Sequence, residues 1–301
     1  MLTFKRKKIF LGLFTGALAL SFSAASFASG YVDLNMGPRP QAMGGAFVAV
    51  ADDVYAGYWN PAGIVQLKEP AVGFMHSNPF GITEVSLDYL VFAHPTALSF
   101  LNGGIGLAYQ KTAAIFESCY SERTGDESIY TLSVAGKIIP RLSYGINLKS
   151  INIDFGEMST SGEAFDFGLL YRFDERYSLG LMMRNLSGKL TNETLRQEKR
   201  LGVAGRFWNN KIIVAIDASH KKEVQGEQEV WRLHAGTELQ VTENIALRVG
   251  FDRESFTAGV GIGFNLGGLI QGASLDYSFK NSEELAVSHR FALSLALGGM
   301  D

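Results

Sequence analysis

The sequence contains a single cysteine, Cys119, among its 301 residues. One cysteine cannot build an internal disulfide framework or a multi-cysteine metal site. Proline is also scarce, with 7 residues, whereas glycine is frequent, with 34. This balance excludes a proline-rich disordered chain and is typical of a protein with many tight turns and closely packed strands.

Long hydrophobic runs and an excess of basic residues are also missing. Beyond the N-terminus no run of about 18 apolar residues occurs, so the sequence predicts no transmembrane helix. Only 19% of the residues are charged, and the formal net charge is −3. An acidic chain is a poor binder of nucleic acid, which excludes nucleic acid as a partner.

The N-terminus has the pattern of a secretory signal. Residues 5–8 are Lys-Arg-Lys-Lys, residues 9–20 are mainly apolar, and Ser26-Phe27-Ala28 offers small residues at a cleavage site. We therefore predict a cleaved signal peptide over residues 1–28. An uncleaved anchor helix is the alternative, but the apolar run is short for one. Removing the four basic residues changes the net charge to −7.

Motifs of known catalytic or cofactor chemistry are missing as well. The sequence has no Gly-x-Ser-x-Gly elbow, and its Gly259-x-Gly261-x-Gly263 is not followed by a predicted helix. The five histidines are scattered; His234 and Glu238 share one strand face, but two residues do not make a metal site. We predict no catalytic residues, no metal and no cofactor, hence not an enzyme. Cys119 receives no role.

From residue 71 onward, apolar and polar residues alternate with a period of two. Residues 245–252 and 165–173 are clear examples, with one apolar and one polar face each. Such alternation predicts β-strands. We place about 14 strands, near 71–77, 83–93, 98–110, 128–138, 142–153, 164–173, 176–186, 199–207, 211–219, 229–240, 244–252, 255–265, 269–279 and 285–297.

The predicted connections alternate in length. Short ones fall at 95–97, 139–141, 174–175, 208–210, 241–243 and 266–268, and longer polar ones at 112–127, 154–163, 187–198 and 220–228. Membrane barrels have short periplasmic turns and longer outer loops in this order. An even strand number also leaves both ends of the barrel on the periplasmic side.

The predicted fold is therefore all-β: a transmembrane antiparallel β-barrel of about 14 strands over residues 71–301. The alternative is a soluble secreted β-sandwich or solenoid, whose turns need not sort by length onto opposite ends. Aromatic residues near the strand ends, such as Tyr171, Phe173, Tyr177, Phe207 and Trp208, favour the barrel because they resemble interface girdles. The protein is expected in the bacterial outer membrane, in contact with its lipid.

Charged residues on the polar strand faces predict a charged lumen. A one-residue slip of a strand would turn its arginine toward lipid, at about 2–4 kcal/mol for a mid-membrane position. The predicted lumen charge network consists of Asp166, Arg172, Arg184, Arg206, Asp217, Arg248, Asp276 and Arg290, and Asp88, Glu238 and Asp252 fall on the same face by the same pattern. Packing and solvation of the barrel interior, or a dedicated substrate path, would each account for these charges.

Residues 29–70 precede the barrel and read as irregular. The stretch 36–67 is rich in small apolar residues, carries Asp52 and Asp53, and is too short to form a core of its own. Asn60 followed by Pro61 predicts the capped start of a short helix. We predict that residues 29–70 form a hatch that plugs the lumen. A small soluble subdomain or a linker is the alternative.

The N-terminal stretch resembles a known family signature. Residues 44–53, Gly-Gly-Ala-Phe-Val-Ala-Val-Ala-Asp-Asp, followed by Trp59-Asn60-Pro61-Ala62-Gly63, resemble the N-terminal motif of PorV/PorQ-type outer-membrane proteins. These are relatives of the FadL long-chain fatty-acid transporters. Weaker similarities occur at residues 167–171, 179–186, 233–236 and 288–291, so the resemblance covers essentially the whole mature chain.

The resemblance implies a 14-stranded barrel with an N-terminal hatch. It implies a hydrophobic small-molecule ligand that leaves sideways into the bilayer, at a kink in the third strand next to the Asn-Pro-Ala of the hatch. Here Asn60, Pro61 and Ala62 match that motif, and Gly103-Gly104 is the candidate lateral opening; a simple bend there is the alternative. PorV-type relatives instead serve type IX secretion, which implies secretion-system proteins and their cargo as alternative partners.

Overall fold

The computed structural model describes residues 34–117, 122–156, 159–191, 193–221, 230–252, 255–281 and 287–298. The predicted signal peptide and Cys119 lie outside these residues. Residues Asn35–Asp301 form one compact unit.

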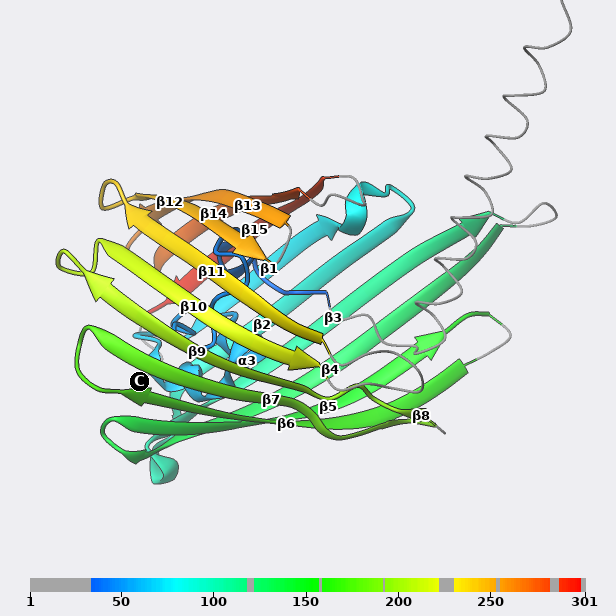
Figure 1. Ribbon diagram of the computed structural model, residues 1–301, viewed down its shortest axis with the longest axis horizontal. Coiled ribbons are helices and arrows are strands. Elements are labelled where there is room, and N and C mark those ends of the chain that lie inside the picture. The colour runs from blue at the N-terminus through cyan, green and yellow to red at the C-terminus, as the bar shows by residue number, and fades with distance from the viewer. Residues whose placement is uncertain are drawn as a thin grey trace, which may run out of the picture. The chain divides into compact units, whose positions relative to one another are not determined.

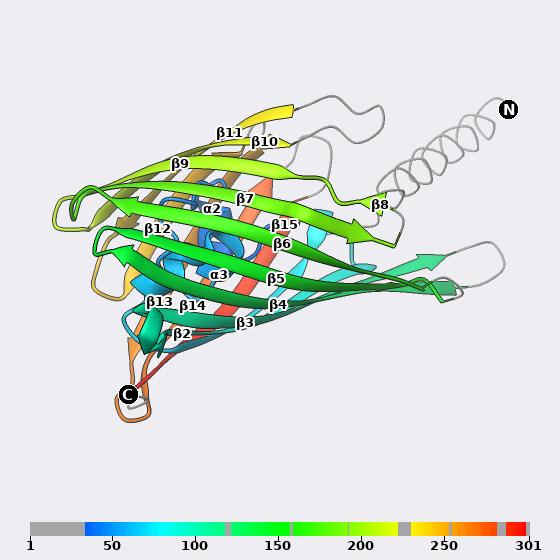
Figure 2. The same cartoon turned by 90° about the horizontal axis from the view of Figure 1, so that it is seen from below.

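Its strands form one antiparallel sheet that closes on itself (Figures 1 and 2). Pairing of β1 with β15 and of β6 with β7 completes the ring. Among the described strands, the two-residue β8 (Glu193–Thr194) pairs with β7 alone, so the ring contains the other 14 strands. These are β1 (Ala71–Asn78), β2 (Val85–Leu98), β3 (Gly103–Glu117), β4 (Glu122–Ile139), β5 (Leu142–Asp154), β6 (Ser159–Arg172), β7 (Tyr177–Leu190), β9 (Glu198–Phe207), β10 (Ile212–Lys221), β11 (Val230–Gln240), β12 (Ile245–Asp252), β13 (Ser255–Asn265), β14 (Ile270–Asn281) and β15 (Ser288–Leu297). The predicted 14-stranded barrel is confirmed.

The period of two separates an inward from an outward face. In β5, Asn147 and Lys149 are buried, whereas Leu148 between them is 54% exposed. The outward face of the other strands carries exposed apolar side chains in the same way, for example Leu90, Val249 and Leu275. An exposed apolar band of this kind is what a lipid-facing surface requires.

The short turn predicted at residues 95–97 is wrong. Strand β2 continues to Leu98, and the turn consists of the 3₁₀ helix η3 (Ser99–Leu101) and Asn102. Asn102 takes a left-handed conformation with φ 46°, which asparagine tolerates better than most residues. Pro95 instead lies in an irregular stretch of β2, where the register with β3 shifts between His94 and Leu98. Proline is tolerated there because the regular β2–β3 hydrogen bonds are interrupted, so its missing backbone N–H costs no ladder bond.

The long polar connections predicted at 112–127 and 154–163 are mostly strand. Strand β3 runs to Glu117 and β4 begins at Glu122, while β6 begins at Ser159. These hairpins extend past the apolar band, where both faces can be polar. The alternation of apolar and polar residues therefore stops before the strands end. For this reason the predicted strands are too short at this end of the barrel. We call this end of the barrel the long-hairpin end and the opposite one the short-turn end.

Asp88 does not lie on the lumen face, so that expectation is wrong. It lies on the outer face with His76, whose Nδ1 is 2.7 Å from the Asp88 carboxylate, and both side chains are more than two-fifths exposed. The inward positions of β2 are Leu87 and Tyr89, both buried. The outer face can carry this charge for two reasons. The pair lies toward the long-hairpin end of β1 and β2, and the His76 ring and the Asp88 carboxylate bind each other.

Residues 35–67, which we call the inner segment, lie inside the ring (Figures 1 and 2). They include the helices α2 (Pro38–Ala42) and α3 (Ala56–Trp59) and the 3₁₀ helix η1 (Pro61–Gln66). The side chains from Ala46 to Ala51 are fully buried, as are Trp59, Asn60 and Ala62. The inner segment thus fills the barrel interior around it like a protein core. No helix among the described residues is long and apolar enough to cross a membrane.

Candidate functional site: the inner segment and its seat

Inward-facing glycines of the barrel wall form the seat of the inner segment. A Cβ added to Gly168 would lie 2.2 Å from Asn60 Oδ1, and one added to Gly180 would lie 2.3 Å from the carbonyl oxygen of Val48. Gly145, Gly236 and Gly250 come equally close to Ala62, Met43 and Gly44. Real Cβ atoms do not approach other atoms this closely, so only glycine permits the backbones to touch.

Asn60 joins the two halves of the inner segment to the wall. Its side-chain oxygen accepts a hydrogen bond from the Ala62 N–H at 3.2 Å and caps η1, as the sequence predicts. Its Nδ2 donates to the carbonyl oxygens of Val48, at 2.9 Å, and of Leu169 in β6, at 3.0 Å. Pro61 occupies the first position of η1, and the Ser143 hydroxyl of β5 donates to the Ala62 carbonyl at 2.9 Å. Of the predicted hatch residues, Asn60, Pro61 and Ala62 therefore lie where the inner segment and the wall meet.

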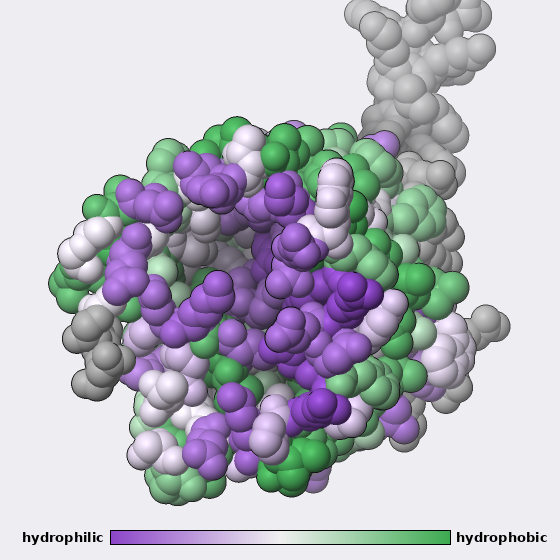
Figure 3. Space-filling view, turned by 90° about the vertical axis from the view of Figure 1, so that its left-hand side faces the viewer, coloured by the Kyte–Doolittle hydropathy of each residue, from purple (hydrophilic) through white to green (hydrophobic). Residues whose placement is uncertain are grey.

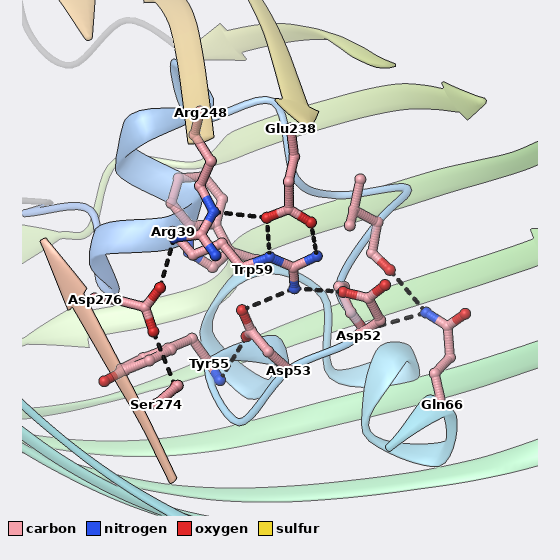
Figure 4. Close-up of polar contacts among 12 residues, drawn as sticks. Arg39, Asp52, Asp53, Tyr55, Trp59, Gln66, Glu238, Arg248, Ser274 and Asp276 are labelled. Carbon is pink, nitrogen blue, oxygen red and sulfur yellow. Dashed lines mark hydrogen bonds and ion pairs between the residues drawn. The ribbon is translucent and has the colours of Figure 1, made fainter. Parts of the chain in front are cut away.

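Asp52 and Asp53 are held by an arginine that the sequence analysis did not single out. Arg39 Nη1 lies 2.6 Å from Asp52 Oδ1 and 3.2 Å from Asp53 Oδ2 (Figure 4). The same guanidinium binds Glu238 of β11 through Nε and Nη2, at 2.7 and 2.9 Å. Asp52 also accepts from Arg206 of β9 at 3.1 Å. One arginine thus ties α2 both to the later part of the inner segment and to the wall.

Two charged residues of the wall extend this cluster. Arg248 of β12 donates from Nε to Glu238 at 2.6 Å and also contacts Asp276 of β14 (Figure 4).

A cavity of about 560 Å³ adjoins the cluster and is lined by Arg39, Asp52, Asp53 and residues near the short turns, including Glu243. Figure 3 shows hydrophilic residues gathered around a hollow at the short-turn end, with apolar residues at the margin. The ion cluster therefore borders a water-accessible vestibule.

Burial and charge shift the pKa values of the inner-segment members. Burial raises the pKa of Asp53 to about 6, and the nearby Arg39 opposes this shift. For Arg39, burial would lower the pKa, but Asp52 and Glu238 outweigh it, so the pKa is raised and the guanidinium stays charged. Burial also raises the pKa of Tyr55, so its hydroxyl stays neutral.

A second ion cluster lies around Trp59. Glu198 of β9 contacts Arg200 at 2.9 Å and Arg184 of β7 at 3.6 Å. The guanidinium of Arg184 lies 4.2 Å from the centroid of the Tyr58 ring, and that of Arg200 lies 5.2 Å from a Trp59 ring centroid. Two cations thus pack on the aromatic rings of α3, which adds cation–π attraction to the ion pairs.

Asp166 binds another residue of the wall, whereas Asp217 binds the inner segment. Asp166 of β6 pairs with Lys149 of β5 at 2.8 Å. Asp217 of β10 accepts the backbone N–H groups of Phe47 and Val48 with Oδ2, at 2.9 and 3.0 Å. A buried carboxylate that holds two main-chain donors fixes the backbone of the inner segment directly.

The eight predicted lumen charges therefore do not form one network. Arg248 and Asp276 meet each other, while Arg184, Arg206, Asp166 and Asp217 each bind other residues. Arg172 and Arg290 have no carboxylate partner among the described residues. The partners that sequence reasoning missed are Arg39, Lys149, Glu198 and Arg200. Lys149, Glu198 and Arg200 lie on inward strand positions, so the period of two could have indicated them.

Gly103 and Gly104 lie at the start of β3, close to the short-turn end. A Cβ on Gly103 would strike the carbonyl oxygen of Ala135, and one on Gly104 would come within 2.3 Å of the His94 carbonyl oxygen. Gly104 is paired with Ala135 of β4, whereas the pairing of β3 with β2 is irregular across this position. The irregularity in the wall thus lies between β2 and β3, and the extra residues belong to β2.

An apolar hollow of about 980 Å³ lies against strands β1 to β7. Many of its lining residues, such as Leu90, Leu107, Tyr130 and Leu148, are half exposed and alternate with buried inward residues. The hollow is therefore largely on the lipid-facing side of the wall. No group of three or more metal-ligating side chains occurs within the described ranges.

The barrel was compared with solved structures. The toluene transporter TodX of Pseudomonas putida superimposes with a TM-score of 0.64 and 12% sequence identity over 89% of this chain and 99% of that one. The toluene transporter TbuX of Ralstonia pickettii gives a TM-score of 0.60 at 12% identity over 87% and 98%. A FadL homologue of Pseudomonas aeruginosa gives 0.58 at 10% identity over 89% and 99%. This chain shares their fold. No protein-family profile and no curated protein matches the sequence.

Proposed function

We propose that this protein resides in the bacterial outer membrane and passes hydrophobic small molecules across it. In this proposal residues 1–28 are a cleaved signal peptide, residues 29–70 are a hatch, and the short-turn end faces the periplasm. The fold is shared with two toluene transporters and a monoaromatic hydrocarbon channel. The FadL-like resemblance of the Asn60-Pro61-Ala62 region supports the same class of ligand.

The observation that carries the proposal is the tight fit of the inner segment. Its side chains from Ala46 to Ala51 are fully buried, and its backbone touches the glycines of the wall. A molecule can therefore pass this level only if the inner segment moves or if the wall opens beside it. Both changes can serve one path, in which the inner segment moves as the gate and the wall provides a side exit. The irregular pairing of β2 and β3 near Gly103 and Gly104 supports such an exit, because a gap opens most easily where ladder hydrogen bonds are already interrupted.

The apolar hollow supports a hydrophobic cargo. Its lining residues Phe92 and Leu107 belong to β2 and β3, the same two strands whose pairing becomes irregular nearer the short turn. A molecule that leaves the interior between these strands would meet apolar side chains and lipid. Polar molecules would lose their hydrogen bonds to water along this apolar route, so transport would favour compounds such as toluene over sugars.

A disulfide lock tests the hatch. In a Cys119→Ser background, Ala62→Cys and Ser143→Cys place one thiol on the inner segment and one on β5, where the Ser143 hydroxyl bonds the Ala62 carbonyl at 2.9 Å. The protein is reconstituted in liposomes, and entry of toluene is measured before and after reduction. We expect the oxidised form to block entry and reduction to restore it.

The matched control joins two wall strands instead. Leu181→Cys with Leu201→Cys links register partners of β7 and β9 on the outer face and should leave entry unchanged. Equal toluene entry through the oxidised Ala62–Ser143 lock would refute movement of the hatch. Entry no faster than through protein-free liposomes, in every form, would refute transport itself. A secreted protein that co-purifies with the barrel would then favour the PorV-type alternative.

A further inference from the structure

Arg290 is a buried cation without a matching anion. Its side chain points inward from β15 and is only 5% exposed. The guanidinium donates from Nη1 to the carbonyl oxygen of Asn35, at the start of the inner segment. Its Nε has no hydrogen-bond partner, and within the described part of the chain no carboxylate lies at ion-pair distance. By contrast, Arg184, Arg206 and Arg248 each have a carboxylate partner.

Two further orphaned polar groups come from the elements around Arg290. Ser278 of β14 is its register partner; it is fully buried, and its hydroxyl makes no hydrogen bond to the described residues. Gln41 of α2 is 3% exposed, and its Nε2 likewise has no partner among them. Helix α2 packs against β13, β14 and β15, and Ala42 lies next to Gly259, the register partner of Ser278. Arg290 and Ser278 are therefore neighbours across β15 and β14, and Gln41 belongs to the helix that packs against these two strands.

The unpartnered atoms of these three residues can all donate a hydrogen bond. Arg290 Nε and Gln41 Nε2 can only donate hydrogen bonds, and the Ser278 hydroxyl is free to donate. An unpaired charge in a protein interior is strongly unfavourable, and each buried polar group without a partner is unfavourable as well. The nearby Arg248, by contrast, is paired with both Glu238 and Asp276. A missing acceptor that carries negative charge would meet all three needs at once.

We propose that Arg290, Ser278 and Gln41 form a binding site for a compact monovalent anion, of the halide or small carboxylate type. The anion accepts from the guanidinium and from the two neutral donors and neutralises the charge of Arg290. Because Arg290 also holds the Asn35 carbonyl, the bound anion fastens the beginning of the inner segment to β15. The site is separate from the vestibule cluster around Arg39 and does not depend on what the barrel transports.

Bromide is the probe for this site, because it scatters X-rays anomalously and resembles chloride in size. The full-length mature protein is crystallised from bromide, and data are collected at the bromine edge. We expect an anomalous peak within about 3.5 Å of Arg290 Nε, the usual range of such hydrogen bonds. We also expect the Tm to rise by a few degrees as bromide replaces sulfate at constant ionic strength, since a ligand that binds only the folded state stabilises it.

Two variants decide whether the effect belongs to this site. Arg290→Gln should lose both the peak and the bromide dependence of Tm. Arg172→Gln is the matched control, because Arg172 is also an inward arginine without a carboxylate partner among the described residues, but it is half-buried; it should retain both. A peak that persists in Arg290→Gln, or a peak without any change in Tm, would mark an adventitious ion only and overturn the proposal.

A carboxylate of the chain itself is the competing source of negative charge. Asp33 lies two residues before Asn35 in the sequence. If Asp33→Asn lowers the Tm, and the wild-type protein shows neither a bromide peak nor a bromide-dependent Tm, the counter-ion is Asp33 and the anion site is refuted. Density for water alone beside Arg290 would refute it as well. If instead Asp33→Asn leaves both bromide effects intact, the anion site stands.

Discussion

Arg39 of the inner segment binds Glu238 of β11 through two parallel hydrogen bonds, from Nε to Oε2 at 2.7 Å and from Nη2 to Oε1 at 2.9 Å. The two residues are 199 positions apart in the chain. The third nitrogen of the same guanidinium serves Asp52 and Asp53. A planar fork that satisfies three carboxylates at once cannot be replaced by lysine without loss of contacts.

Replacing Arg39 with methionine should destabilise the protein by about 3 kcal/mol, because the buried Glu238 and the partly buried Asp52 and Asp53 would lose their common partner. Unfolding of the detergent-solubilised barrel by heat or urea would measure the loss. Lys111→Met is the control, since Lys111 and Asp126 form an exposed pair and surface pairs contribute about 0–1 kcal/mol. Equal, small effects of both substitutions would contradict a structural role for Arg39.

The stability of the protein should depend on pH through Asp53. Its pKa in the folded protein, about 6, exceeds the ordinary value of 3.8, so the folded form binds more protons than the unfolded form between these values. Stability should therefore fall as the pH rises from about 4 to about 6 and then level off, by on the order of 1 kcal/mol from this group. Asp53→Asn should remove this slope, whereas Asp126→Asn should retain it; an unchanged slope in Asp53→Asn would contradict the assignment.

A methyl group added to the seat should displace the inner segment. Gly168→Ala would place a Cβ 2.2 Å from Asn60 Oδ1, and overpacking of this kind destabilises by about 1–3 kcal/mol. Hydrogen exchange of the inner-segment amides should become faster. Gly263→Ala is the matched control, because the nearest atom to its added Cβ would be 3.8 Å away. Protection of these amides in Gly168→Ala equal to that in Gly263→Ala would show that the seat is not tight.

Removing the Asp217 carboxylate should loosen one turn of the inner segment. Asp217→Ala leaves the buried N–H groups of Phe47 and Val48 without an acceptor, at about 1–3 kcal/mol for each unsatisfied group. Asp217→Asn retains one oxygen and should lie between wild type and Asp217→Ala in stability. Amide exchange at residues 47 and 48, compared with residue 64 in η1, would locate the effect. Uniform loosening across all three amides would argue against a local anchor.

The period of two made the strands of this barrel predictable, because lipid on one side and a filled interior on the other enforce alternation. The prediction failed beyond the apolar band, where the two faces of a strand no longer differ. There β3 continues to Glu117 and β4 begins at Glu122, and Asp88 faces outward beside His76. The turn predicted at residues 95–97 was misplaced for a different reason. Proline occurs in irregular parts of strands as well as in turns, and Pro95 lies in such a part of β2.

The inner segment was predictable in outline but not in its contacts. Small apolar residues and the capped Asn60-Pro61 indicate a short folded piece that needs a host. Its partners lie far away in sequence, as with the hydrogen bond from Thr257 to the carbonyl of Ala42, 215 residues apart. Pattern reasoning is local and contains no information on which wall residue will meet Arg39 or Trp59. Only the closed ring brings them together.

The seat of the inner segment also determines when that segment can acquire its structure. It is the first part of the described chain to be synthesised, yet Met43 and Gly44 rest on Gly236 and Gly250, which come about 200 residues later. Contacts of such long range form late, because the intervening chain must first be ordered. The N-terminal piece therefore waits unfolded for the last strands.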